Sequence, residues 1–192
     1  MAPDSGTVAT DGELVLRRLR DDPEDYASMG RWLSDERVLE FYGGRDAPLD
    51  PTRAAADYLE TTGPDGPTFG CVIELDARPI GYVQFYRWLD HPEDAARIGM
   101  TEPGAYGIDL FIGEPELWGR GLGTRTVELV VRHLVEERAA MLMTLDPLTT
   151  NARAIRAYEK AGFRKDRIVT DTQLHEGEHR DLWLMVRTEP RR

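Results

Sequence analysis

Three glycines at alternate positions, Gly119, Gly121 and Gly123, lie directly before a segment with helical periodicity. In residues 124–138 the valines and leucines recur on one helical stripe, which predicts a helix beginning at Gly123 or Thr124. A helix N-terminus presents unpaired backbone N–H groups and the positive end of a dipole, and glycines let a ligand approach that backbone. The spacing therefore predicts a phosphate-binding loop.

The glycines do not match two familiar phosphate-binding motifs. A P-loop would carry a lysine after its last glycine, and this sequence has none there. A dinucleotide-binding loop would read Gly-x-Gly-x-x-Gly in an early strand–helix–strand unit, whereas these glycines read Gly-x-Gly-x-Gly late in the chain. A tight turn that binds nothing is the alternative for the loop taken alone.

Two aspartates could take part in acid–base chemistry or bind a cation. Asp109 lies in a strand expected at residues 106–113, on the face opposite its aliphatic residues, and Asp146 ends a second strand expected at residues 141–146. Asp109 could act as a base if burial raised its pKa, act through a water, or hold a cation, and the sequence does not separate these roles. Asp146 could supply a second anion or only cap the following turn.

The surrounding pattern predicts one domain of alternating strands and helices. Residues 1–12 are expected to be a disordered lead and residues 13–188 a single domain, because no repeat or long linker divides the chain. Residues 88–105 are expected to form an irregular charged excursion. The other expected elements are a strand at 13–20, a helix capped by Asp22, short helices at 36–42 and at 52–59 with Thr52 as cap, a hairpin turning at 76–79, and a helix at 152–163 capped by Thr150 or Asn151.

Acidic residues outnumber basic ones by 35 to 24, which gives a net charge of −11. This charge disfavours a nucleic acid or an anionic membrane as partner and favours a cationic ligand, although a solvated acidic surface explains the same number. We find no apolar run near the ~18 residues of a membrane span and no signal-peptide pattern, so we expect a cytoplasmic protein. The sequence leaves open whether it is a monomer or a homodimer.

The cysteine and the histidines offer no further site. Cys71, the single cysteine, excludes an intramolecular disulfide and is expected to be a buried apolar residue without a partner for a covalent acyl-enzyme. His175 and His179 have a metal-like spacing only in a helix, and Gly177 between them predicts a hairpin turn instead. No metal is expected.

The chain resembles the GNAT superfamily of N-acetyltransferases, which use acetyl-coenzyme A. The resemblance covers roughly residues 13–188, and "NARAIRAYEKAGF" (Asn151 to Phe163) is its most specific motif. Within the superfamily the sequence resembles the aminoglycoside 6'-N-acetyltransferases, on "EFYGG" (40–44), "PIGYVQFY" (79–86), "GID" (107–109), "GLGT" (121–124) and Asp146-Pro147. The implied fold is α/β of the α+β type, with a twisted, mixed, mostly antiparallel sheet flanked by helices and two central strands that splay apart.

The resemblance implies direct acetyl transfer from acetyl-coenzyme A to an amine, with Asp109 and Tyr158 as the catalytic base and acid. A tyrosine of pKa ~10 that protonates a thiolate of pKa ~8.5 works uphill by about 2 kcal/mol, which is small beside an acyl-transfer barrier. An ordinary core tyrosine is the alternative. The implied contacts with a cationic amine substrate are Phe41, Tyr42, Gln84, Tyr86, Asp109 and Asp146.

Cofactor contacts are implied along the two splayed strands, the glycine loop and the helix after it. Pantetheine amides would pair with the backbone of the first strand, and many superfamily members carry Gln or Arg where this chain has Trp118. The implied contacts are Leu110, Phe111, Ile112, Trp118, Gly119, Arg120, Gly121, Leu122, Gly123, Thr124, Asn151, Ala154, Tyr158 and Lys160.

Two alternatives to an aminoglycoside acetyltransferase stay open. The first is an acyltransferase of the same fold that acts on another amine, such as a siderophore-type lysine or hydroxylysine or a polyamine. Those siderophore-type relatives tend to carry a histidine beside the catalytic aspartate, whereas this chain reads Gly107-Ile108-Asp109. The second is a protein that binds an aminoglycoside or coenzyme A without turnover, against which the intact set of Asp109, the glycine loop, Asn151 and Tyr158 argues.

Overall fold

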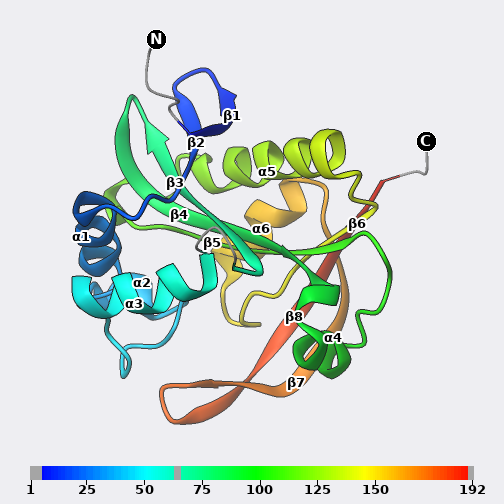
Figure 1. Ribbon diagram of the computed structural model, residues 1–192. Helices are drawn as coiled ribbons and strands as arrows, with labels where there is room; N and C mark the ends of the chain where they lie inside the picture. The colour runs from blue at the N-terminus through cyan, green and yellow to red at the C-terminus, as the bar shows by residue number, and fades with distance from the viewer. Residues whose placement is uncertain (1–5, 63–65, 190–192) are drawn as a thin grey trace.

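An eight-stranded sheet runs through the molecule in the order β1-β2-β3-β4-β5-β6-β8-β7 (Figure 1). The computed structural model describes residues 6–62 and 66–189. All neighbouring strands are antiparallel except β5 and β6, which confirms the mixed, mostly antiparallel sheet that was predicted. The strands are β1 (Thr7–Asp11), β2 (Leu14–Arg18), β3 (Thr68–Leu75), β4 (Arg78–Arg87), β5 (Ala105–Ile112), β6 (Leu142–Leu145), β7 (Arg164–His175) and β8 (Glu178–Thr188).

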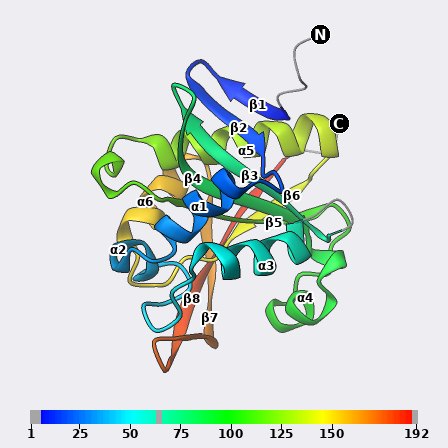
Figure 2. The ribbon, with the colours of Figure 1, turned by 60° about the vertical axis from the view of Figure 1, so that its left-hand side comes forward.

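Helices cover both faces of this sheet. In Figure 1, α5 lies above β3 and β4 while α3 lies below them, and Figure 2 gives a second view of the same layers. One core joins the sheet to α5 and α6, and a second joins it to α1, α2 and α3. The helices are α1 (Pro23–Trp32), α2 (Glu36–Leu39), α3 (Pro51–Thr62), α4 (Pro92–Ile98), α5 (Leu122–Arg138) and α6 (Ala152–Lys160), with 3-10 turns η1 (Trp88–Asp90) and η2 (Pro115–Leu117). Among the described residues no helix has the length and apolar character needed to cross a membrane.

The two central strands part after a short paired stretch. β5 and β6 pair only where Ala105–Gly107 faces Leu142–Thr144, whereas β5 stays paired with β4 as far as Ile112. Beyond Gly107 one edge of β5 therefore carries backbone groups that β6 does not use. This is the splay that the resemblance implied.

The disordered lead predicted for residues 1–12 is too long. Thr7–Asp11 forms β1, which pairs with β2 through a turn at Gly12, whose φ is +62°. α5 holds this strand, because Arg132 donates to the Thr10 carbonyl at 2.7 Å and Arg125 reaches the Asp11 carboxylate at 3.1 Å. Residues 1–5 of the expected lead lie outside the described residues.

Some predicted helix boundaries are also corrected. α1 begins as predicted, with the Asp22 side chain accepting from the Glu24 N–H. The cap before α3 is Asp50, which accepts from the Arg53 N–H at 2.9 Å, and not Thr52. The segment 88–105 contains helix α4 instead of being irregular throughout.

Candidate active site

A cavity of about 840 Å³ opens where β5 and β6 diverge. Its wall includes the glycine loop, the ends of both central strands and one side of α6. All the predicted site residues line it except Gln84 and Arg120. Residues far apart in the sequence thus meet at one place, as the resemblance implied.

The glycine loop forms the N-terminal end of α5. Gly119 and Gly121 have φ of +76° and +81°, which only glycine adopts without strain, and no side chain caps the helix. Gly123 has neither a positive φ nor a neighbour within 4 Å of the position that a Cβ would take. Neither backbone conformation nor internal packing therefore explains this third glycine, and a closely approaching ligand would. Arg120 is exposed and is not among the residues that line the cavity.

The free edge of β5 borders the same cavity. The Gly113 N–H donates to the Ile80 carbonyl of β4 at 2.8 Å, and backbone groups alternate sides along a strand, so those of Leu110 and Ile112 face the splay. The same alternation turns the backbone of Phe111 toward β4. Trp118 donates its indole N–H to the Ile112 carbonyl at 2.7 Å.

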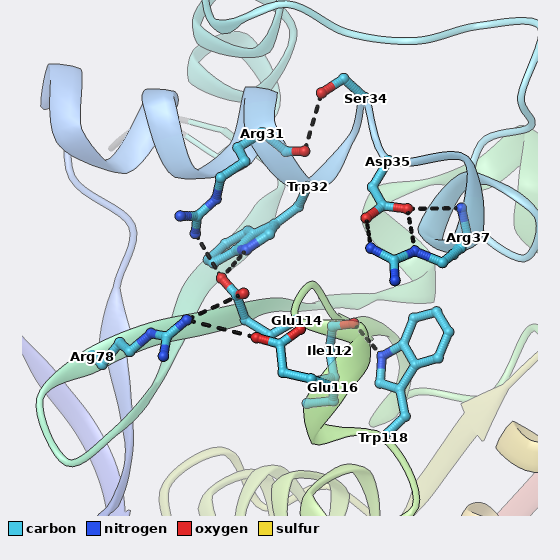
Figure 3. A network of polar contacts seen from close by, with 10 residues as sticks. All are labelled: Arg31, Trp32, Ser34, Asp35, Arg37, Arg78, Ile112, Glu114, Glu116 and Trp118. Carbon is cyan, nitrogen blue, oxygen red and sulfur yellow. Dashed lines mark hydrogen bonds and ion pairs between the residues drawn. The ribbon is translucent and has the colours of Figure 1, made fainter.

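Glu114 holds the end of β5 through a network of polar contacts (Figure 3). Its carboxylate accepts from Arg31 at 2.7 Å and from the Trp32 indole at 3.0 Å, and it pairs with Arg78 at 3.3 Å. Trp32 lies so close to Gly113 that a Cβ there would come within 2.2 Å of the indole ring. These contacts tie α1 and the β3–β4 hairpin to the point where β5 leads into the glycine loop.

Asp109 is oriented from the neighbouring strand. Gln84, its cross-strand partner on β4, donates to the Asp109 carboxylate at 2.8 Å and accepts from the Tyr82 hydroxyl at 2.9 Å. Burial raises the pKa of Asp109, and the hydrogen bond from Gln84 opposes that rise. Gln84 therefore lies behind the carboxylate and not on the cavity wall. The substrate contact expected for Gln84 would have required it to lie on that wall.

Asp146 faces Asp109 from the end of β6. Burial, followed by the negative charge of Asp109, raises the pKa of Asp146 to about 8. Two carboxyl groups in one enclosed space do not both ionise easily, so the pair holds a proton at neutral pH. A bound ammonium group would favour ionisation of both. A cationic ligand would therefore be chemically compatible with this pair.

Tyr158 lies on α6 with 8% of its surface exposed. Burial, with the charges of Asp109 and Asp146, raises its pKa above the usual range, so in the free protein the phenol is neutral and is a weaker acid than an exposed tyrosine. At the start of the same helix, the Asn151 amide oxygen accepts from the Ala154 N–H at 3.1 Å. This cap leaves the amide nitrogen of Asn151 as the group that can serve a ligand.

Aromatic rings line the end of the cavity near the carboxylates. Tyr42 packs edge-on against Phe111, with 4.7 Å between ring centroids. Tyr86 lies across the backbone of Gly107, where a Cβ would come within 2.5 Å of its ring. Because Gly107 has no Cβ, the Tyr86 ring can lie beside Asp109.

Sequence reasoning missed three residues that shape this site. Tyr82 holds Gln84, Arg97 of α4 lines the cavity, and the Arg153 guanidinium lies 3.7 Å from the centroid of Trp118. A signal for α4 was present, since Pro92 stands at the first helical position with acidic residues after it. The described residues contain no group of three or more metal-ligating side chains, and His175 and His179 flank a β7–β8 hairpin turn as predicted.

Residues 21–171 match the family model described as an acetyltransferase (GNAT) domain. The chain therefore belongs to the GNAT family and is an acetyltransferase. It is 32% identical over 163 residues to aminoglycoside N(6')-acetyltransferase type 1 of Klebsiella pneumoniae, covering 85% of this chain and 80% of that protein.

Two further similarities bear on the substrate. The crystal structure of aminoglycoside acetyltransferase AAC(6')-Ib with coenzyme A and kanamycin is 28% identical, with a TM-score of 0.75 and coverage of 91% of this chain and 94% of that one. N(6)-hydroxylysine O-acetyltransferase of Escherichia coli is 29% identical over 77% of this chain, but only 45% of that protein is covered.

Proposed function

We propose that this protein transfers the acetyl group of acetyl-coenzyme A to the 6'-amino group of an aminoglycoside, directly and within a ternary complex. The observation that carries the proposal is that Asp109 and Asp146 face the same cavity as the uncapped glycine loop. One end of the cavity suits a polycation and the other a pyrophosphate. Similarity to aminoglycoside N(6')-acetyltransferases supports the choice of acceptor.

The cofactor would lie along the free edge of β5. Its pyrophosphate would accept hydrogen bonds from the N–H groups at the start of α5, and its pantetheine amides would pair with Leu110 and Ile112 as an added strand does. The Asn151 amide nitrogen and Lys160 line the same cavity and would serve the pantetheine arm and a phosphate. This route brings the thioester to the gap between the carboxylates and Tyr158.

In the transfer itself, the substrate ammonium would give a proton to Asp109, directly or through a water. The neutral amine nitrogen then bonds to the acetyl carbon, the carbon–sulfur bond breaks, and Tyr158 protonates the departing thiolate. The nitrogen releases its second proton as the amide forms; that proton restores the tyrosine, and Asp109 gives the first proton to solvent. The raised pKa of Asp109 suits the first step. A substrate cation beside Asp109 and Asp146 would offset the charges that raise the pKa of Tyr158, which would ease the last step. Asp146 and the rings of Phe41, Tyr42 and Tyr86 would hold the sugar amines and faces.

A second candidate is acetylation of a lysine-type or hydroxylysine-type substrate; the similarity to the Escherichia coli N(6)-hydroxylysine O-acetyltransferase favours the hydroxylysine type. Purified protein with acetyl-coenzyme A should release free thiol with kanamycin, tobramycin or gentamicin, and product mass and NMR should place the acetyl group on the 6'-nitrogen. Thiol release only with hydroxylysine, lysine derivatives or spermidine would show that this amine, and not an aminoglycoside, is the acetyl acceptor. Coenzyme A binding without release on any acceptor would favour a non-catalytic binding protein.

We also propose that the reaction takes place in the cytoplasm, where acetyl-coenzyme A is produced, and that it needs no metal. Activity unchanged by a chelator would support the second point. Size-exclusion chromatography with light scattering would distinguish a monomer from a homodimer.

A further inference from the structure

The far end of the β7–β8 hairpin projects from the sheet and reaches the loop between α2 and α3 (Figures 1 and 2). This contact joins residues that are 135 positions apart in the sequence. Both segments also contribute to the cavity wall, residues 41–43 from the loop and Leu174 from the hairpin. The shape of the wall near the aromatic rings thus depends on how the two segments meet.

His175 makes the first contact between the two segments. It lies at the end of β7 with 4% of its surface exposed, and its Nε2 donates to the Glu40 carbonyl at 3.0 Å. That carbonyl belongs to the peptide unit that leads into Phe41, and the N–H of the same unit donates to the Val38 carbonyl at 3.2 Å. Because a peptide unit is planar, engagement of both its polar groups fixes the direction in which the chain enters Phe41.

The imidazole of His175 has no second role in the part of the chain that the structure describes. Its other ring nitrogen, Nδ1, is buried there without a hydrogen-bond partner. Since a carbonyl oxygen can only accept, the ring hydrogen lies on Nε2. Replacement of the ring by an apolar side chain would therefore remove one hydrogen bond, the one to Glu40.

Arg45 and Glu176 make the second contact, beside the first. The guanidinium of Arg45 forms two parallel hydrogen bonds with the carboxylate of Glu176, one of 2.7 Å from Nη2 to Oε2, and the Arg45 backbone N–H donates to the same group at 3.2 Å. Glu176 and Gly177 have φ of +54° and +73°, which gives a tight two-residue turn with the carboxylate at its tip. Such a two-pronged pair fixes direction as well as distance.

The hairpin also holds the loop that follows β6. The Trp183 N–H donates to the Pro147 carbonyl at 2.9 Å, and the Thr149 N–H donates to the Asp181 carbonyl at 3.0 Å. Asp146 directly precedes Pro147 in the sequence. One hairpin therefore joins the loop that carries Phe41 to the loop beside a cavity carboxylate.

We propose that the two contacts, His175 with Glu40 and Arg45 with Glu176, form a clasp that shapes the acceptor end of the cavity, with His175 as a positioning residue for Phe41. This inference rests on the proposed function, in which Phe41 contacts the aminoglycoside. None of the four clasp residues is among the described residues that line the cavity, so they act through the residues they hold. The clasp should matter for the acceptor and not for coenzyme A, whose proposed contacts lie on β5, α5 and α6.

The test compares His175→Leu with His175→Gln, which can still donate to the Glu40 carbonyl. In His175→Leu the KM for kanamycin, and its dissociation constant in protein saturated with coenzyme A, should rise about three- to tenfold, the effect of one lost hydrogen bond. The kcat should stay within about twofold and coenzyme A affinity should not change, because the lost interaction serves acceptor binding alone. His175→Gln should recover most of the kanamycin affinity.

Arg45→Gln should weaken kanamycin binding in the same way, and Arg180→Gln is its matched control. Arg180 pairs with Glu178 at 2.9 Å within the hairpin, so loss of that pair should leave kanamycin binding at the wild-type level. Arg45 is half exposed, so its variant decides alone if His175→Leu does not fold, and a wild-type KM in it would then overturn the inference.

A His175 that serves only stability would lower the unfolding temperature of His175→Leu and leave the KM for kanamycin at the wild-type value, which would overturn this inference. So would a His175→Gln protein that binds kanamycin as weakly as His175→Leu does. Both results leave the proposed function standing if wild type acetylates kanamycin. A wild-type protein that neither binds nor acetylates kanamycin would overturn both proposals.

Discussion

Gln84 donates a hydrogen bond of 2.8 Å to the carboxylate of Asp109, the proposed base, from the adjacent strand, and it is not among the residues that line the cavity. Its amide oxygen is already occupied by the Tyr82 hydroxyl, which fixes the amide with its nitrogen toward Asp109. The ionised form of Asp109 is the one that this donor favours.

Replacement of Gln84 by methionine should therefore raise the pKa of Asp109 further. The acidic limb of the kcat/KM profile should move to higher pH, while the affinity for coenzyme A stays the same. Tyr82→Phe, which keeps the Gln84 donor but removes its support, should move the limb less. An acidic limb at the wild-type position in Gln84→Met would show that this hydrogen bond does not set the basicity of Asp109.

Asp146 should be exchanged for asparagine to test the carboxylate pair. Its folded-state pKa of about 8 lies above the ordinary value of 3.8, so the native protein holds an extra proton between these values. This proton contributes its full share to the free energy of unfolding below pH ~4, and that contribution is lost as the pH rises toward 8.

Asp146→Asn should thus raise the unfolding temperature at pH 8 by about 2–6 °C and change it little at pH 4. The same variant should raise the KM for kanamycin at least about tenfold, because one anionic contact is lost. Calorimetry and steady-state kinetics check the two effects, with Asp90→Asn as the exposed control. A variant that is less stable at pH 8 than wild type would contradict the raised pKa.

A substitution at Gly123 should change stability and cofactor affinity in opposite directions. Gly123→Ala lies in the first turn of α5 with open space around the new methyl group, so stability should rise by about 0.5–1 kcal/mol. Coenzyme A affinity should fall at least about tenfold, because the methyl group occupies the place of the approaching phosphate. Denaturant unfolding and calorimetric titration measure the two quantities.

Gly121→Ala serves as the contrast, since its φ of +81° should make it lose stability as well as affinity. If Gly123→Ala binds coenzyme A as tightly as wild type does, the pyrophosphate does not bind at this loop.

Tyr158→Phe should lower kcat by about 10²–10³-fold and leave both KM values within a few-fold of wild type. The reason is that the thiolate loses its proton donor while the ring still packs against the core. Tyr106→Phe, at an equally buried tyrosine outside the described cavity wall, should keep wild-type turnover. Equal turnover in the two variants would make Tyr158 an ordinary core residue.

Much of the fold and most of the site were predictable, because the decisive signals are local. Helical periodicity after the glycines gave the start of α5 to within a residue or two, and Gly121 proves to be its N-cap. The motif from Asn151 to Phe163 implied α6 and its cap, and both are found. Such features depend on residues a few positions apart.

The misses depend on contacts between distant segments. β1 exists because β2 and α5 hold a strand that is short and polar on its own. Gln84 shares a strand face with Tyr82 and Tyr86, and only the position of Asp109 on β5 decides that Gln84 points at a carboxylate. No spacing along the chain carries that information.

The proposed reaction is tested most directly by acetyl-coenzyme A-dependent thiol release with kanamycin by wild type and by Asp109→Asn, alongside acetyl-coenzyme A binding to both. It requires steady release by wild type, a 6'-acetylated product, and release at least about 100-fold slower in the variant with cofactor affinity unchanged. Wild-type protein that releases no thiol with kanamycin, or a variant that turns over at the wild-type rate, would contradict it.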